Sequence, residues 1–163
     1  MVKMRRTILI ILVVVFAAQP AASNDTQPEQ RIRSTFGLAL GSPAGFNFFY
    51  THVNDPSLGF RVSGGFIPND EGGGTGGLQV NLLRSVRGGR DYSLEESFIL
   101  EYTSIGGGRG RSAKTWLYIG LAGSIRWKAL FLEIGLTAGS GSYTSPQAVL
   151  QLGVVLHTSR CDR

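Results

Sequence analysis

The sequence contains few of the residues that stabilise small proteins through disulfide bonds or metal binding. Its 163 residues include a single cysteine, Cys161, and only two histidines, His52 and His157. One thiol cannot form an intramolecular disulfide, and two histidines do not make a metal site. These shortages exclude a disulfide-rich domain and disfavour a metal-dependent one, and we expect no cofactor and no metal ion.

Lysine is also scarce. Beyond the N-terminal segment only Lys114 and Lys128 occur, and both fall at expected strand ends or turns. The exterior of a soluble domain normally carries many long charged side chains. This scarcity disfavours an exterior that is covered by water.

No apolar run is long enough to be a transmembrane helix, which needs about 20 residues. The run from Ile8 to Ala18 is preceded by Lys3, Arg5 and Arg6 and followed by small residues up to Ser23. This layout is typical of a secretory signal peptide. We interpret residues 1–23 as a signal peptide for export through the Sec route; the alternative is an uncleaved membrane anchor.

The basic charge belongs partly to that segment. The net charge of +5 falls to +2 once the three N-terminal cations are removed, so it does not indicate nucleic-acid binding. The remaining chain, about 140 residues, is the size of one domain. We expect a flexible lead-in at 24–34, a barrel at 35–158 and a tail at 159–163.

What the chain does have is apolar residues at every second position, which is the period of a strand. In the stretch from Thr115 to Gly139, a two-residue loop at Lys128 and Ala129 sets Trp127 opposite Leu130 and keeps all apolar residues on one face. Eight such segments occur, with turn signals between them. They are 35–41, 46–52, 58–66, 77–83, 93–104, 115–127, 130–139 and 148–157.

This pattern predicts an all-β fold, an eight-stranded antiparallel up-and-down barrel. We expect the connections at 42–45, 68–77, 106–114 and 139–147 on one side and those at 54–57, 85–92 and 128–129 on the other. Three of the first four are long and glycine-rich, an asymmetry that is typical of outer-membrane barrels.

The second face of each strand consists of small or polar residues. In a lipid-embedded barrel the apolar face points outward and this face lines the lumen. The alternative is a soluble periplasmic lipocalin-like barrel whose apolar face encloses a ligand. Buried charges need partners, and we expect Arg61 and Arg126 to pair with Glu101 and Glu133. The expected lumen network also contains Gln79, Asn81 and Gln151, with Asn47 and Glu95 on the same face.

The last strand has a polar residue, a glycine and alternating apolar residues, seen at Gln151, Gly153, Leu156 and Thr158. With the signal peptide, the eight segments and the hairpin at 115–139, it makes the whole mature chain resemble small eight-stranded outer-membrane β-barrel proteins of Gram-negative bacteria. The chain departs from them in continuing through SRCDR instead of ending on an aromatic residue. The resemblance implies residence in the bacterial outer membrane, insertion by the barrel assembly machinery, and contact with outer-membrane lipids and lipopolysaccharide.

One sequence motif suggests phosphate binding. Residues 108–115 are a near match to a phosphate-binding loop, but such a loop needs a helix after it and a strand is expected here. The cations in it, Arg109, Arg111 and Lys114, remain candidate contacts for lipopolysaccharide phosphates.

Some small outer-membrane barrels that resemble this chain modify lipid A. Nucleophilic catalysis of that kind requires a serine and a histidine oriented by a carboxylate. His52 and His157 fall at the wrong end for that chemistry. We therefore expect no enzyme, and instead a structural or interaction role through the outer loops. A porin is disfavoured because eight strands leave no continuous aqueous channel.

Overall fold

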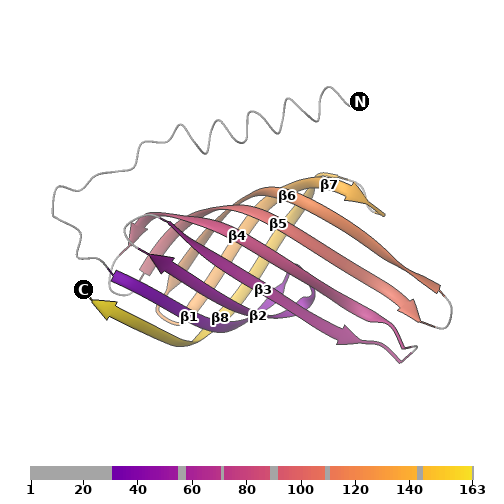
Figure 1. Cartoon of the computed structure of the whole chain (residues 1–163), viewed down its shortest axis with the longest axis horizontal. Coiled ribbons are helices and arrows are strands. Elements are labelled where there is room, and N and C mark those ends of the chain that lie inside the picture. Colours follow the sequence, from indigo (N-terminus) through magenta and orange to yellow (C-terminus); the bar gives the residue numbers. More distant parts are fainter. Residues whose placement is uncertain are drawn as a thin grey trace, which may run out of the picture.

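The structure, a computed structural model, describes residues 31–54, 58–70, 72–88, 92–108, 111–142 and 145–162. These residues form eight antiparallel strands, and β1 pairs with β8, so that the sheet closes into a barrel with its strands in chain order (Figure 1). The expected eight-stranded up-and-down barrel is confirmed. The strands are β1 (Arg31–Gly41), β2 (Gly45–Asn54), β3 (Leu58–Pro68), β4 (Gly74–Gly88), β5 (Tyr92–Gly108), β6 (Arg111–Trp127), β7 (Leu130–Gly141) and β8 (Gln147–Asp162).

The two ends of the barrel differ. β1 begins and β8 ends at the same end, which we call the terminal end; the β2–β3, β4–β5 and β6–β7 connections also lie there (Figure 1). The other four connections lie at the opposite end, the loop end. No helix occurs among the described residues, and thus none that is long and apolar enough to cross a membrane. The expected signal peptide lies outside the described residues.

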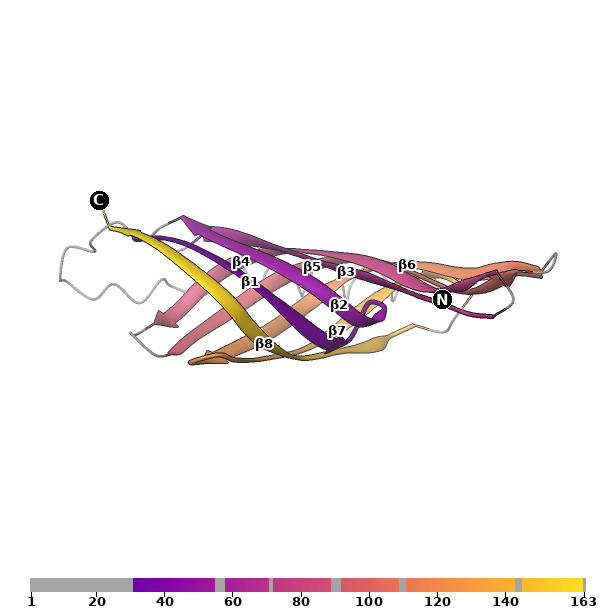
Figure 2. The same cartoon turned by 90° about the horizontal axis from the view of Figure 1, so that it is seen from below.

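The hairpin of β6 and β7 has the predicted register. Trp127 pairs with Leu130 across a turn at Lys128 and Ala129. Lys128 has a φ of 52°, and two-residue hairpin turns of types I′ and II′ both need a positive φ at this first position. Strands on opposite walls run in crossed directions (Figure 2), as expected when strands tilt to close a small barrel.

The barrel is polar inside and apolar outside. Glu133 and Gln151 are fully buried, whereas Leu40 and Leu136 are 62% and 64% exposed. Apolar side chains turn outward on every strand, and the interior holds only small apolar clusters, one of which joins Phe49 to Phe131. Outward-facing examples from β1 to β8 are Phe36, Phe48, Phe60, Leu82, Leu100, Leu117, Ile134 and Leu152.

The barrel strands extend beyond the boundaries expected from the sequence. β1 begins at Arg31, inside the expected lead-in, and β8 continues to Asp162, through the expected tail. The reason is that the two ends pair with each other, from Arg31 and Asp162 onward. Such pairing satisfies backbone groups whatever the side chains are, so it leaves no local signal in either segment.

At least half of the residues in each long loop expected at 68–77, 106–114 and 85–92 belong to strands. β4, β5 and β6 have 15, 17 and 17 residues, and β5 pairs with β6 as far as Gly108 and Arg111. Glycine interrupts the visible alternation of side chains but keeps both backbone hydrogen-bonding groups. The loop end therefore carries short connections on long strands, and not long loops.

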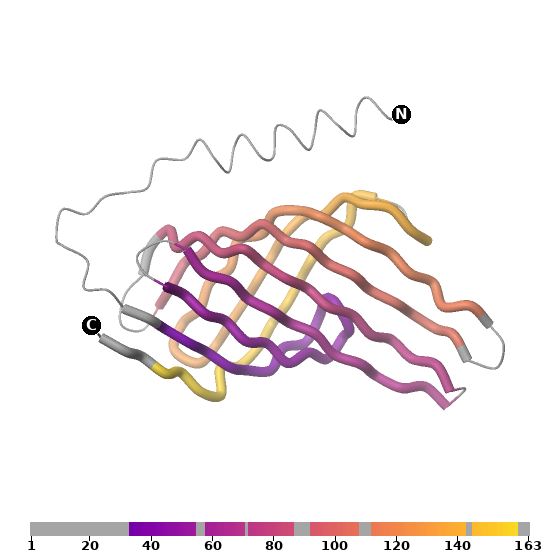
Figure 3. The backbone as a smooth tube through the Cα atoms, in the orientation of Figure 1, coloured from indigo at the N-terminus to yellow at the C-terminus, as the bar shows by residue number. Residues whose placement is uncertain are grey.

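The turn between β1 and β2, residues 42–44, folds over the barrel interior instead of extending with the other hairpins (Figure 3). Ala44 is fully buried, and the Thr103 hydroxyl donates to the Pro43 carbonyl at 3.2 Å. Asn47 supports the turn: its side-chain amide donates to the carbonyls of Gly41 and Ser42. The turn thus narrows the loop end of the lumen.

Gly77 of β4 gives this turn the space it needs. A Cβ atom at Gly77 would lie 2.7 Å from the Pro43 Cβ and 2.8 Å from the Tyr102 carbonyl oxygen. We expect Gly77→Ala to lower the free energy of unfolding by about 1–3 kcal/mol, as overpacking does, in a urea titration of the folded barrel. The matched control is Gly123→Ala, where a Cβ meets nothing within 4 Å. Equal stability of the two variants would contradict this account of the turn.

Candidate functional site

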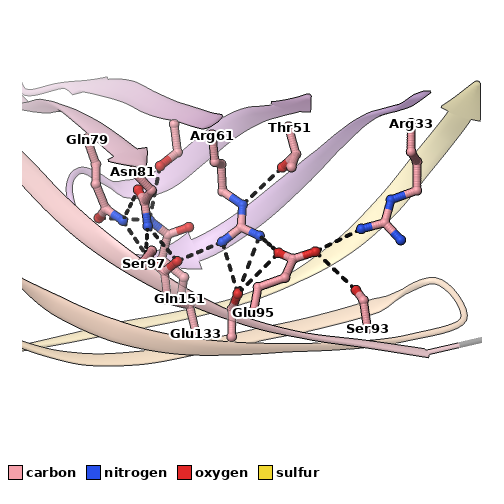
Figure 4. Close-up of polar contacts among 12 residues, drawn as sticks. Arg33, Thr51, Arg61, Gln79, Asn81, Ser93, Glu95, Ser97, Glu133 and Gln151 are labelled. Atoms are coloured by element: carbon pink, nitrogen blue, oxygen red, sulfur yellow. Dashed lines mark hydrogen bonds and ion pairs between the residues drawn. The ribbon is translucent and has the colours of Figure 1, made fainter. Parts of the chain in front are cut away.

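Arg61 lies at the centre of the lumen network (Figure 4). It stands on β3 at an inward position of the alternation and is 3% exposed. Its guanidinium donates to Glu133 at 2.7 Å, to Glu95 at 2.8 Å and to the Thr51 hydroxyl at 3.0 Å. It also lies 4.3 Å from the centre of the Phe131 ring. One cation from β3 therefore bridges carboxylates of β5 and β7 across the lumen.

Glu133 receives amide donors on its other side. Gln79 donates to its Oε1 at 2.6 Å and Asn81 donates to its Oε2 at 2.8 Å. The side-chain amide of Gln151 on β8 donates in turn to the side-chain Oε1 of Gln79 and to the Ser63 hydroxyl, each at 3.1 Å (Figure 4). The network thus links β3, β4, β7 and β8 around one carboxylate.

A second cation completes the charge balance. Arg33 of β1 donates to Glu95 Oε1 at 2.8 Å, so two arginines face two carboxylates, Glu95 and Glu133. Arg33 falls in the lead-in expected at 24–34, so the expected strand boundaries do not predict this role. The alternation of side chains along the strand does indicate it, because Arg33 lies two residues before Thr35 and therefore on the same, inward face of β1.

The expected partners of Arg126 and Glu101 need correction. Arg126 pairs in register with Ser93, eight residues before Glu101 on β5. That separation is about 26 Å of strand at about 3.3 Å per residue. Arg126 donates instead to the Thr35 hydroxyl at the terminal end, whereas Glu101 lies toward the loop end.

Glu101 belongs to a pocket of about 320 Å³ at the loop end of the lumen. Glu101 and Tyr118 form one cross-strand pair in its wall, and Thr103 and Trp116 form the next one toward the mouth. The inward turn at Pro43 closes one side of the pocket. The sequence does not predict this pocket, because its pattern indicates an ordinary outward connection at 42–45.

The candidate lipopolysaccharide contacts are only partly described. Arg109 and the side chain of Arg111 lie outside the described residues, while Lys114 is exposed on β6, opposite Ile105 of β5. The near match to a phosphate-binding loop therefore runs into a strand and not into a helix.

The histidines lie at the terminal half of the barrel. His52 of β2 shares a hydrogen bond of 2.9 Å with the Ser34 hydroxyl and packs against the Phe60 ring. Among the described residues no carboxylate bonds to His52, and no group of three or more histidine, cysteine or acidic residues could hold a metal ion. A serine and a histidine are thus adjacent without an orienting carboxylate.

No protein-family model matches the sequence, and no curated protein matches it. Among solved structures the chain is similar to the crystal structure of the N-terminal β-barrel domain of Pseudomonas aeruginosa OprF. The similarity covers 79% of this chain and 98% of that chain, at 14% sequence identity and a TM-score of 0.46. The chain is an eight-stranded β-barrel. At this level of similarity, inferences about its function come from its own residues.

Proposed function

We propose that the protein is an integral barrel of the bacterial outer membrane, with a structural or interaction role through its loop end. The observation that carries the proposal is the inverted burial pattern. Leucine, isoleucine and phenylalanine side chains face outward on every strand, whereas soluble monomers rarely expose apolar patches above a few hundred Å². Lipid acyl chains are the surroundings that such an exterior fits.

Strand number and length support the same conclusion. A closed barrel leaves no unpaired edge in the hydrocarbon, and a membrane-spanning strand needs about 9–11 residues. The shortest strand, β2, has 10 residues. A lipocalin-like carrier fits poorly, because its apolar lining would have to be inside, where this barrel holds Arg61, Glu95 and Glu133.

The filled lumen favours a role other than diffusion of solutes. Around Arg61 at the terminal half, the remaining space is about 10 Å³, which is no more than about one water molecule requires. A continuous aqueous path is therefore not favoured. Catalysis is not favoured either, since His52 lacks the orienting carboxylate that nucleophilic catalysis needs.

The proposal includes partners. Lys114, with Arg109 and Arg111 next to it in the sequence, would meet lipopolysaccharide phosphates, for which arginine and lysine are suitable donors. The alternation of β8 through Gln151, Gly153 and Leu156 is the feature that we expect the barrel assembly machinery to bind. An external partner would meet the loop end, toward which β5 and β6, the two longest strands, extend.

Fractionation tests the location. We expect the protein in the outer-membrane fraction, extracted by detergent and not by high salt, because its exterior is apolar. Unheated samples should migrate differently from boiled ones on a denaturing gel, since a closed barrel resists unfolding by detergent. Recovery in a salt-washed periplasmic extract, with no heat-dependent shift, would contradict the proposal.

A further inference from the structure

Glu101 differs from the other buried carboxylates of the lumen. Glu95 and Glu133 each bind an arginine at 2.7–2.8 Å. Glu101 is equally buried, at 5% exposure, but its only hydrogen-bond partner among the described residues is the Thr103 hydroxyl, at 3.1 Å from Oε1. Its Oε2 atom is buried and accepts no hydrogen bond from the described residues.

Thr103 does not fully satisfy even the first oxygen. Its hydroxyl is also 3.2 Å from the Pro43 carbonyl oxygen, and a hydroxyl has one proton to donate. Thr103 can therefore donate to the turn or to Glu101, but not to both. As an anion, a carboxylate buried in this way is costly unless a cation or a donor supplies the missing interactions.

The pocket supplies room for such a group. Its volume is about 320 Å³, which is within the range of small-molecule sites. Trp116 and Tyr118, both buried, line it with ring centres 6.2 Å apart and planes inclined by 59°. Tryptophan and tyrosine faces attract cations, so the rings and the carboxylate favour the same class of ligand.

We propose that this pocket is a binding site for a small organic cation that carries N–H donors, such as a primary amine. The ammonium group donates to Glu101 Oε2, and the carbon chain lies along Trp116 and Tyr118. The site uses only the geometry of the loop end, so it does not depend on the outer-membrane location or on a protein partner.

Tryptophan fluorescence tests the site. The chain has two tryptophans, Trp116 in the pocket and Trp127 on the barrel exterior. In a Trp127→Phe background, the full chain in detergent micelles is titrated with putrescine and, separately, with 1,4-butanediol, which has the same length without charge. We expect a saturable change in Trp116 emission with putrescine and none with the diol. Equal responses to both probes would overturn the proposal.

The carboxylate is tested by Glu101→Gln, which keeps the size of the side chain. We expect at least about a tenfold loss of putrescine affinity, because a hydrogen bond to a charged group contributes about that much. Glu96→Gln removes the same charge from the opposite face of β5 and should leave the affinity unchanged. Folding of each variant is checked by its heat-dependent gel shift. Unchanged affinity in folded Glu101→Gln would overturn the assignment.

Tetramethylammonium separates the two attractions in the pocket. It is a cation without N–H donors, so it can approach the rings but cannot donate to Glu101. We expect it to bind more weakly than putrescine. Binding as tight as that of putrescine would overturn the role of Glu101 as hydrogen-bond acceptor.

Discussion

Replacing Arg61 by methionine is expected to lower the free energy of unfolding by about 3–5 kcal/mol, the usual effect of stranding a buried charge. The substitution leaves Glu133, which is fully buried, without its cation, and leaves Glu95 with Arg33 alone. Glu133→Leu should have a similar effect, because it leaves Arg33 and Arg61 to share Glu95 and removes the acceptor of the Gln79 and Asn81 amides. Urea unfolding of the barrel in lipid vesicles, followed by tryptophan emission, measures both.

The double variant Arg61→Met/Glu133→Leu distinguishes a paired network from two independent sites. Because the partners are in contact, it should lose less stability than the sum of the single variants, by about 0.5–3 kcal/mol. Glu96→Leu is the control, since Glu96 lies on the outward face of β5 and should show little change. If each single change had a negligible effect on the free energy of unfolding, and the two effects simply added, Arg61 and Glu133 would face water.

Arginine in the middle of the outer face should also be strongly destabilising. Ile134 lies within β7 and is 58% exposed. If that face meets acyl chains, Ile134→Arg should lower stability by about 2–4 kcal/mol, the effect of arginine at the bilayer midplane. Unfolding titrations in vesicles give the value.

Leu130 is the matched control on the same strand. It is the first residue of β7, beside the turn, and is 52% exposed, so Leu130→Arg should lose only about 0–1 kcal/mol near the interface. In a packed core, replacing isoleucine by alanine lowers the free energy of unfolding by about 2–5 kcal/mol. Ile134→Ala should lower it by less, because lipid fills the space. Equal penalties for arginine at Leu130 and Ile134, with a large alanine penalty, would contradict a lipid-facing surface.

The sequence predicts the barrel because each strand repeats one physical rule. Apolar residues such as Leu117 and Ile134 alternate with small or polar ones, and this parity assigns each residue to one face. The register of the β6–β7 hairpin follows from the single choice of a turn at Lys128. The ends of the strands cannot be predicted from this alternation, because pairs such as Arg31 with Asp162 form between segments far apart in the chain.

The lumen pairing illustrates the same limit. Parity correctly turns Arg61 and Glu133 inward, but it does not say which inward residues share a height in the barrel. That height depends on how far each strand is staggered against the next, which no short pattern encodes. As a result Glu95 occupies the place expected for Glu101, and the sequence does not predict the inward turn at Pro43 or the pocket beside it.

The unequal strand lengths have a consequence for how the barrel stands in a membrane. β5 and β6 reach Gly108 and Arg111, while β2 and β7 have only 10 and 12 residues. In a bilayer the rim would be oblique, with one wall rising into water as a two-sided sheet. Apolar alternation has no purpose there, because neither face meets lipid. In the proposed membrane setting, the change from leucine-rich to glycine-rich sequence toward the loop end of β4 and β5 would mark the depth at which the hydrocarbon ends.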